Sequence, residues 1–289
     1  MRWRDGRRSN NVEDARGSGG GGMGGGGGFK LGIGGLVIAA AAYFLGVDPR
    51  VIMSVMEGAQ GGATQETASV ATSQPTDEAG DFMSVVLADT EDTWTEIFRA
   101  SGQAYSPPRL RLYEGGTRSG CGSASAEAGP FYCPADQRVY IDPAFFEELA
   151  RRFKAPGDFA QAYVLAHEVG HHVQTLIGVS DKVRAAQRRG SQEEQNALQV
   201  RMELQADCFA GIWANHAQRS RNLLESGDVE EALGAAAAVG DDMIQKRAQG
   251  YVVPESFTHG SAAQRQHWFE QGFQSGQVAA CDTFAARSL

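Results

Sequence analysis

The sequence predicts an α+β domain, with helices packed on a small sheet, preceded by one transmembrane helix. Three observations lead to this prediction. Residues 31–47 contain no charged side chain and are largely apolar. Two short segments, residues 109–113 and 138–142, alternate polar and apolar side chains, as half-buried strands do. Longer stretches toward the C-terminus carry apolar side chains at helical spacing.

The N-terminal region differs in composition from the rest of the chain. Residues 1–30 hold six basic and three acidic side chains, giving +3, and the remainder holds 20 basic and 32 acidic ones, giving −12. Ten of the 37 glycines lie between Gly17 and Gly28. Without that run the composition is that of a globular protein, which excludes collagen-like and wholly disordered chains. Because the acidic body would repel a polyanion, we expect no nucleic-acid partner.

Residues 30–47 are expected to form the transmembrane anchor. As a helix, their 17 uncharged residues would cover about 25 Å, close to the thickness of a bilayer core. Basic residues before the run and Asp48 after it predict a cytoplasmic N-terminus. A cleaved signal peptide and a buried core helix are the alternatives, and the long basic region before the run disfavours the former.

The anchor divides the chain into four parts. Residues 1–29 are interpreted as a flexible cytosolic tail, rich in glycine and basic side chains. Residues 48–80 are small and polar and are interpreted as a flexible linker. Residues 81–289 are then the folded domain, and we expect it in the periplasm or outside the cell, on a single-pass inner-membrane protein.

The chain has four cysteines, and this even number is consistent with a location outside the cytoplasm. An even number of cysteines outside the cytoplasm suggests two disulfides. Cys121 and Cys133 bracket a loop of small residues that a bridge would pin, which leaves Cys208 to pair with Cys281. Free buried thiols or a metal site are the alternatives, although these spacings differ from zinc-knuckle patterns.

A metal-binding pattern lies in a predicted helix over residues 158–177, for which Asp158 is the expected N-cap. His167 and His171 are four residues apart, so both imidazoles project from one face and can reach a single ion. Glu168 lies beside this face, where a carboxylate can activate water and pass its proton to a leaving amine. His172 points about 100° away from His171 and cannot complete the same site.

A third ligand is expected from a second predicted helix, around residues 200–213. Glu203 and Asp207 share one face of this otherwise apolar stretch, where acidic groups are costly unless they are paired or metal-bound. We assign Glu203 as the third ligand and Asp207 as the acceptor for the free N–H of a ligating histidine. A solvated acidic face or a helix salt bridge is the alternative.

These residues carry a resemblance. The pattern His-Glu-x-Gly-His-His, followed about thirty residues later by Glu-Leu-Gln-Ala-Asp-Cys, resembles the gluzincin zinc peptidases. More narrowly, the chain is similar to the bacterial, membrane-anchored neutral zinc metallopeptidase family. The similarity extends along nearly the whole chain, to residues 1–4, 129–134, 139–142 and 257–261.

The resemblance implies a zincin-like metallopeptidase domain that uses Zn²⁺. In such domains an edge strand beside the motif helix pairs with the substrate backbone, and residues 138–142 are the candidate, with an interior strand as the alternative. Related membrane zinc peptidases have a Thr-His-Pro stretch after the Glu/Asp helix. By that likeness we expect His259 to donate a hydrogen bond to the oxyanion of the reaction, although Gly260 replaces the proline here, and a structural histidine that caps the loop is the alternative. Ser261 is the expected cap of the following helix.

The sequence thus favours a zinc-dependent endopeptidase acting on a peptide or protein substrate, attached to the membrane through one N-terminal helix. His167, His171 and Glu203 would hold the metal, with Glu168 and His259 as the catalytic residues. A catalytically idle, zinc-containing assembly module of the cell envelope is the alternative. A cytosolic enzyme whose apolar run is part of the core is a third. No phosphate-binding loop and no Gly-x-Ser-x-Gly motif is present.

Overall fold

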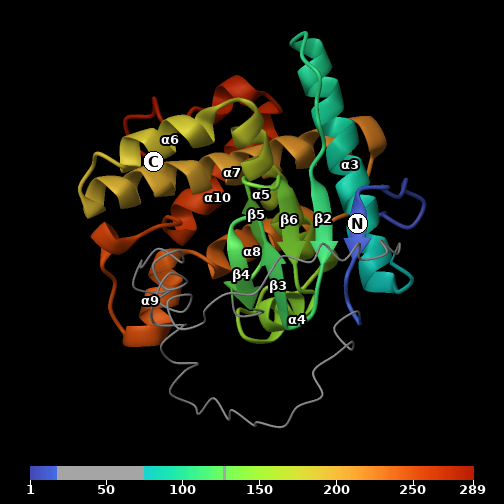
Figure 1. Ribbon diagram of the computed structural model, residues 1–289, viewed down its shortest axis with the longest axis horizontal. Helices are drawn as coiled ribbons and strands as arrows, with labels where there is room; N and C mark the ends of the chain where they lie inside the picture. Colours follow the sequence, from blue (N-terminus) through green and yellow to red (C-terminus); the bar gives the residue numbers. More distant parts are fainter. Residues whose placement is uncertain (18–74, 126–127) are drawn as a thin grey trace, which may run out of the picture.

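The computed structural model describes residues 1–17, 75–125 and 128–289 (Figure 1). The expected transmembrane segment, residues 30–47, and most of the expected linker lie outside these described residues. None of the described helices combines the length and the apolar character that a membrane span requires. The first described element after these residues is a helix that begins at Glu78, three residues before the expected domain boundary.

The described strands form a mixed four-stranded sheet and a separate two-stranded hairpin. The sheet has the order β1-β2-β6-β5, in which β1, β2 and β6 are parallel and β5 is antiparallel to β6. Strands β3 and β4 form the hairpin. The bounds are Val12–Asp14 (β1), Arg109–Leu112 (β2), Gly116–Ser119 (β3), Gly122–Ser125 (β4), Phe131–Cys133 (β5) and Arg138–Ile141 (β6).

Strands β2 and β6 confirm the two strands expected from alternation. Their apolar side chains, among them Leu110, Leu112 and Val139, have no solvent exposure and form the centre of the core. The expectation that residues 138–142 form the edge strand is wrong, because β6 lies between β2 and β5. The short β5 takes the edge position, and alternation could not reveal this because it reports burial and not strand order.

The helices pack around this sheet (Figure 1). Helix α5 contacts β5, β6 and α3, and it also packs against α7 and α8. The bounds are Glu78–Ala100 (α3), Ala144–Arg151 (α4), Asp158–Leu176 (α5), Val179–Gln187 (α6), Gln192–Arg221 (α7), Asp228–Ala238 (α8), Asp241–Gln249 (α9) and Ala262–Ser275 (α10), with short 3₁₀ turns at Pro254–Ser256 (η3) and Val278–Cys281 (η4).

Helix α7 has close neighbours on both sides because glycines stand at the contacts. A Cβ on Gly170 of α5 would lie 3.0 Å from the carbonyl oxygen of Ala206. A Cβ on Gly211 would lie 2.1 Å from the carbonyl oxygen of Phe269, and one on Gly272 would lie 1.9 Å from that of Cys208. The backbones of α5 and α10 therefore contact the backbone of α7, which brings side chains from three helices together.

The helix caps confirm one expectation and correct another. Ser261 caps α10 through a capping box, as expected. Asp158 is not the N-cap of α5: Gly157 occupies that position and no side chain caps the helix. The carboxylate of Asp158 instead lies 3.0 Å from the amino group of Met1, and Asp228 at the start of α8 lies 3.4 Å from it.

Residues 1–17 are part of the folded domain, which corrects the expectation of a flexible tail over residues 1–29. Trp3 is 7% exposed and packs edge-to-face against Phe82 of α3, with ring centroids 5.2 Å apart. Glu13 of β1 binds Arg111 of β2 and Arg138 of β6, so one carboxylate joins three strands. Composition suggested a solvated tail because the segment is basic, but its arginines have acidic partners in the domain.

This packing also bears on the expected topology. Strand β1 pairs with β2 in register from Val12 and Leu110 to Asp14 and Leu112. Two strands cannot pair in this way when a membrane separates them. The described fold is therefore incompatible with placing residues 1–17 and the domain on opposite faces of a membrane.

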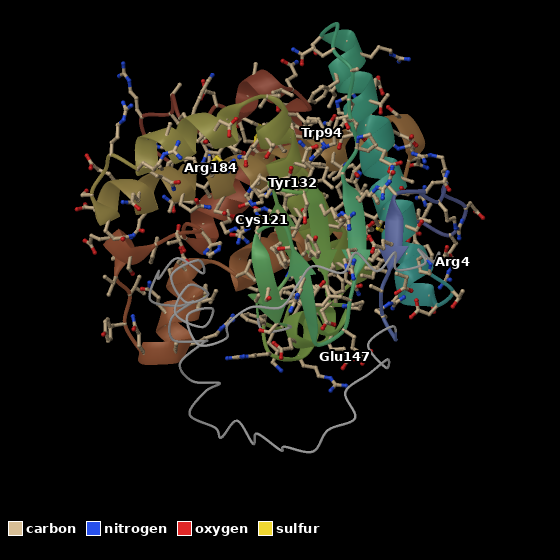
Figure 2. All side chains as sticks on the ribbon, viewed as in Figure 1. Arg4, Trp94, Cys121, Tyr132, Glu147 and Arg184 are labelled. Atoms are coloured by element: carbon tan, nitrogen blue, oxygen red, sulfur yellow. A yellow bond between two sulfur atoms is a disulfide. The ribbon has the colours of Figure 1, made fainter. Side chains whose placement is uncertain are left out.

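Both expected disulfides are present in the structure. Cys121, in the turn between β3 and β4, is bonded to Cys133 at the end of β5, which fastens the hairpin to the sheet (Figure 2). Cys208 of α7 is bonded to Cys281 of η4, which fastens the C-terminal segment to the long helix. Both pairings are those expected from the sequence.

Candidate metal centre

The structure brings His167, His171 and Glu203 together at the contact between α5 and α7. Nε2 of His167 lies 3.1 Å from Oε2 of Glu203, and Nε2 of His171 lies 3.4 Å from the same oxygen. Ligands held at 2.0–2.1 Å around a tetrahedral zinc ion are about 3.3 Å apart. The spacing, the residue types and the burial of the cluster fit a zinc ion held by two histidines and a glutamate.

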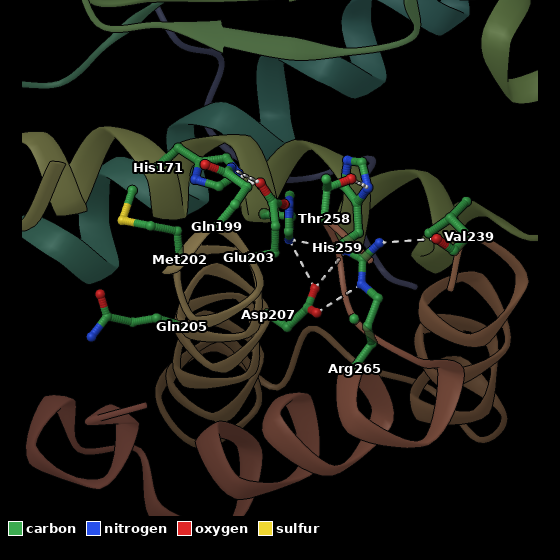
Figure 3. Close-up of polar contacts among 12 residues, drawn as sticks. His171, Gln199, Met202, Glu203, Gln205, Asp207, Val239, Thr258, His259 and Arg265 are labelled. Atoms are coloured by element: carbon green, nitrogen blue, oxygen red, sulfur yellow. Dashed lines mark hydrogen bonds and ion pairs between the residues drawn. The ribbon is translucent and has the colours of Figure 1, made fainter. Parts of the chain in front are cut away.

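His167 is oriented by Asp207 of α7. Its Nδ1 lies 2.8 Å from Oδ1 of Asp207, which is one turn beyond Glu203 on α7 and has no solvent exposure. Arg265 of α10 binds the same carboxylate through Nε at 2.8 Å and Nη2 at 2.9 Å, and the hydroxyl of Tyr163 donates to it as well (Figure 3). With Nδ1 donating to a carboxylate, the lone pair of Nε2 faces the metal position.

His171 is oriented by an amide instead of a carboxylate. Its Nδ1 lies 2.9 Å from Oε1 of Gln174, one turn farther along α5. Glu203 is itself held by Gln199 of α7, whose Nε2 donates to Oε1 at 2.8 Å. The other oxygen, Oε2, is therefore the one that faces both histidines.

The charges at the centre shift the pKa values of its members. Burial opposes the charged form of Asp207, but Arg265 and His167 outweigh burial and lower its pKa to about 2. Burial also opposes charge on His167, yet Asp207 and Glu203 raise its pKa to about 10. Burial likewise opposes charge on His171, while Glu203 and, to a smaller extent, Glu168 raise its pKa. Protons and a divalent cation therefore compete for the same imidazole nitrogens.

Glu168 occupies the position expected of a general base. It follows His167 on α5 and is 8% exposed. Burial opposes charge on His171, and the charge of Glu168 is the smallest of the causes that raise its pKa. A carboxylate next to a ligand on the motif helix can take a proton from attacking water without itself being a ligand.

His259 lies in the loop before α10 and is held by Asp241, the first residue of α9. Oδ2 of Asp241 accepts the backbone N–H groups of Thr258, His259 and Gly260 at 2.6–3.0 Å. Its Oδ1 lies 3.2 Å from Nδ1 of His259. Burial opposes charge on His259 and by itself lowers its pKa. The hydrogen bond with Asp241 and the charge of Glu203 outweigh burial, so the pKa of His259 is raised. His259 is therefore near the metal ligands, as Figure 3 also shows.

The glycine that replaces the proline of the related stretch has a structural reason. Gly260 has φ of +91° and its N–H donates to Asp241 at 3.0 Å. Proline has φ near −65° and no N–H, so it could satisfy neither condition. The departure from the Thr-His-Pro pattern is thus compatible with a fixed His259.

His172 stays outside the centre, as the helical geometry predicts. Its Nε2 lies 2.6 Å from the carbonyl oxygen of Ser106, and its Nδ1 lies 3.1 Å from the hydroxyl of Tyr132 on β5 (Figure 2). Burial lowers the pKa of His172, so it is a neutral side chain that joins α5 to its neighbours.

Four side chains near the centre have no role in the expectations drawn from the sequence: Tyr163, Gln174, Arg265 and Asp241. Tyr163 lies one turn before His167 on the motif helix, and Gln174 lies one turn after His171. This spacing places both side chains on the face of the ligands, so it could have predicted their contact with the centre. Arg265 and Asp241 reach the centre only because α9 and α10 pack against it. No local pattern in the sequence distinguishes them from other charged residues on helices.

An α+β domain with two histidines of an HExxH helix and a glutamate from a later helix defines a zinc-metallopeptidase type of centre. The chain belongs to the family described as "Putative neutral zinc metallopeptidase", whose model matches residues 1–284.

The family has relatives in distant bacteria. The chain is 51% identical over 289 residues to "Uncharacterized protein YpfJ" of Escherichia coli (strain K12), covering 98% of this chain and 99% of the relative. It is 44% identical over 222 residues to "Uncharacterized protein Rv2575" of Mycobacterium tuberculosis (strain ATCC 25618 / H37Rv), covering 73% and 74%. No solved structure gives a significant match to the chain.

Proposed function

We propose that this protein is a zinc-dependent endopeptidase. The observation that carries the proposal is a cluster of two histidines and one glutamate, in which both histidines are oriented by buried partners and Glu168 directly follows His167 on the same helix. A centre that only supported folding would have no use for a base at that position. Family membership supports the same class of activity.

The residues divide the chemistry among them. His167, His171 and Glu203 would hold the zinc, which would supply Lewis-acid polarisation of the scissile carbonyl and a more nucleophilic water at neutral pH. Glu168 takes the proton of the attacking water and passes it to the leaving amine. His259, fixed through Asp241, donates a hydrogen bond to the oxyanion as negative charge develops on it.

Substrate is proposed to bind along β5. This strand is at the edge of the described sheet and contacts the motif helix α5. An extended peptide that pairs with an edge strand uses its backbone groups, so varied sequences are tolerated. The disulfide between Cys121 and Cys133 would keep this strand in position while substrate binds.

The proposed site of action is outside the cytoplasm. Disulfides persist in oxidising compartments, and the domain has two of them. Because residues 1–17 are part of the same fold, the proposal places them in that compartment together with the domain.

Peptide-library digestion by the full-length protein tests the proposal. The wild type is expected to cleave internal peptide bonds, and a zinc chelator should abolish cleavage. Glu168→Gln should keep its zinc, measured by elemental analysis, and lose at least about 100-fold in rate, because a general base contributes that much or more. Glu147→Gln, at an exposed position on α4, is the control and should cleave normally.

Three results would contradict parts of the proposal. Full activity of Glu168→Gln would remove Glu168 from the mechanism. Full zinc occupancy in Glu203→Ala would remove Glu203 from the ligand set. A wild-type protein that binds zinc and cleaves no library peptide would favour the assembly module instead.

A further inference from the structure

The two histidines of the centre are oriented by groups of different kinds. His167 donates to a carboxylate that is neutralised by Arg265. His171 donates to a neutral amide, Gln174, which has no solvent exposure. Metal-bound histidines commonly donate to a carboxylate, as His167 does. A neutral amide orients His171 only if other groups hold that amide in place.

The orientation of Gln174 is determined by its own partners. Its Nε2 donates to the carbonyl oxygen of Met202 at 2.7 Å and to Oε1 of Gln205 at 3.1 Å. Both partners are acceptors, so the nitrogen must face them and Oε1 must face His171. Nδ1 of His171 then carries the proton, and its Nε2 is left to bind metal.

The chain of hydrogen bonds continues from Gln205 to the C-terminal segment. Gln205 is 6% exposed, and its Nε2 donates to the carbonyl oxygen of Cys281 at 3.0 Å. Cys281 is bonded to Cys208, which lies three residues after Gln205 on α7 and has no solvent exposure. The disulfide therefore holds this carbonyl against the helix that presents Gln205.

We propose that Gln174 and Gln205 are positioning residues that connect the metal ligand His171 to the disulfide between Cys208 and Cys281. Each donor in the series points away from the metal and toward Cys281, so the dipoles are aligned and each bond strengthens the next. Opening the disulfide releases the last acceptor and loosens the orientation of His171. This inference rests on the proposed zinc site.

Zinc affinity of the folded protein distinguishes positioning from packing. Loss of a partner behind a ligand typically weakens metal binding by about 10- to 100-fold. We expect Gln174→Ala to fall in this range, and Gln205→Ala to show a smaller loss. Asn215→Ala is the matched control, because Asn215 is a buried amide on α7 that donates to the carbonyl oxygen of Phe273, remote from the centre.

A spectroscopic measurement accompanies the affinities. The ¹⁵N spectrum of His171 in the zinc-loaded protein should show a proton on Nδ1 with a strong hydrogen bond. In Gln174→Ala this signal should shift, while that of His167 stays in place. An unchanged His171 signal and an affinity equal to that of Asn215→Ala would overturn the inference.

The two disulfides provide an internal comparison. The double variant Cys208→Ser with Cys281→Ser should bind zinc more weakly than the wild type. The double variant Cys121→Ser with Cys133→Ser, which removes the other bridge, should retain wild-type affinity. Equal affinities in the two double variants, or an effect of Gln174→Ala with none from Gln205→Ala, would overturn the connection to the disulfide.

These outcomes are separable from failure of the proposed function. A wild-type protein that binds no zinc would contradict the zinc site itself. A wild-type protein that binds zinc tightly, with variants that bind it equally well, would contradict only the connection. Neither measurement requires peptidase activity.

Discussion

Asp207 is the residue on which the charge balance of the centre depends. It has no solvent exposure, and a buried carboxylate without a partner is strongly unfavourable. Arg265 of α10 and Tyr163 and His167 of α5 all donate to it, so its charge is stabilised from two helices. The hydrogen bond between Asp207 and His167 also orients that imidazole. The stability of the fold and the geometry of the metal centre therefore both depend on the carboxylate of Asp207.

Removal of Arg265 should therefore be costly in two ways. Arg265→Met leaves Asp207 charged and buried without its cation, and such losses cost about 3–5 kcal/mol in the free energy of unfolding. Zinc affinity should fall as well, because Asp207 no longer holds His167. Denaturant unfolding and zinc titration measure the two effects.

The matched control for Arg265 is an exposed ion pair. Arg151 pairs with Glu147 on α4, with side chains 84% and 73% exposed. Arg151→Met should change stability very little, since water already solvates both charges. Equal stability losses in the two variants would contradict the special role of the buried pair.

Zinc binding should release protons. In the metal-free protein the pKa of His167 is raised to about 10, and that of His171 is also raised. Below those values both imidazoles hold protons that zinc must displace, so the apparent zinc affinity should rise with pH through the neutral range. The protonated His167 stabilises the metal-free fold below its ordinary pKa, and this contribution is lost as pH rises through about 10.

Titration calorimetry in buffers of different ionisation enthalpy measures this release. The slope of the observed enthalpy against the buffer enthalpy should correspond to about one proton or more at neutral pH. A slope of zero, with affinity independent of pH, would contradict the raised pKa values.

At the scale of elements, the close contact of α7 with α10 positions Arg265. The two helices approach so closely that carbonyl oxygens lie where side chains of Gly211 and Gly272 would begin. This distance allows a side chain on α10 to reach Asp207 of α7. The glycines thus serve the metal centre although neither contacts it.

Gly211→Ala should separate the two helices. Its Cβ would lie 2.1 Å from the carbonyl oxygen of Phe269, which cannot move without its helix. We expect a loss of about 1–3 kcal/mol or more in the free energy of unfolding, and weaker zinc binding because Arg265 moves away from Asp207.

Gly234→Ala is the control for this prediction. Gly234 is also in a helix, α8, but a Cβ there would have nothing within 4 Å. Alanine favours helix over glycine by about 0.5–1 kcal/mol, so this variant should be slightly more stable than the wild type. Thermal unfolding of both variants is the measurement, and equal changes would argue against the close contact.

At the scale of the whole molecule, residues 1–17 complete the domain from a distant part of the chain. Strand β1 extends the sheet beside β2, and Trp3 covers α3. The long segment between residue 17 and residue 75 therefore connects two parts of one fold. The amino group of Met1 also lies 3.0 Å from the carboxylate of Asp158, so this segment contacts the first residue of the helix that carries the two histidines.

Trp3→Ala should destabilise the full-length protein by about 3–5 kcal/mol, the usual cost of removing a large buried aromatic side chain. Asn10→Ala, at an exposed position of the same segment, should have little effect. Thermal unfolding checks both. If Trp3→Ala unfolded like the wild type, the segment would be a dispensable tail, as its composition alone suggests.

Local chemistry determined much of this protein. The four-residue spacing of His167 and His171 and the acidic pair on an apolar helix are short-range patterns, and helix geometry places residues four apart on one face in any context. These patterns predicted the metal-binding group without a fold. The even number of cysteines and the loop between Cys121 and Cys133 predicted the two disulfides.

Only the tertiary structure decided the rest. Strand order, and with it the edge position of β5, depends on long-range pairing that alternation does not encode. The partners Arg265 and Asp241 arrive on helices whose place is set by glycine contacts and loop geometry. From its composition, the basic N-terminal segment was expected to be a solvated tail, because composition does not reveal which acidic residues pair with its arginines in the fold. Arg8 and Glu13 of this segment form ion pairs with residues more than fifty positions away in the sequence. Such pairs stabilise the protein only after the chain has folded.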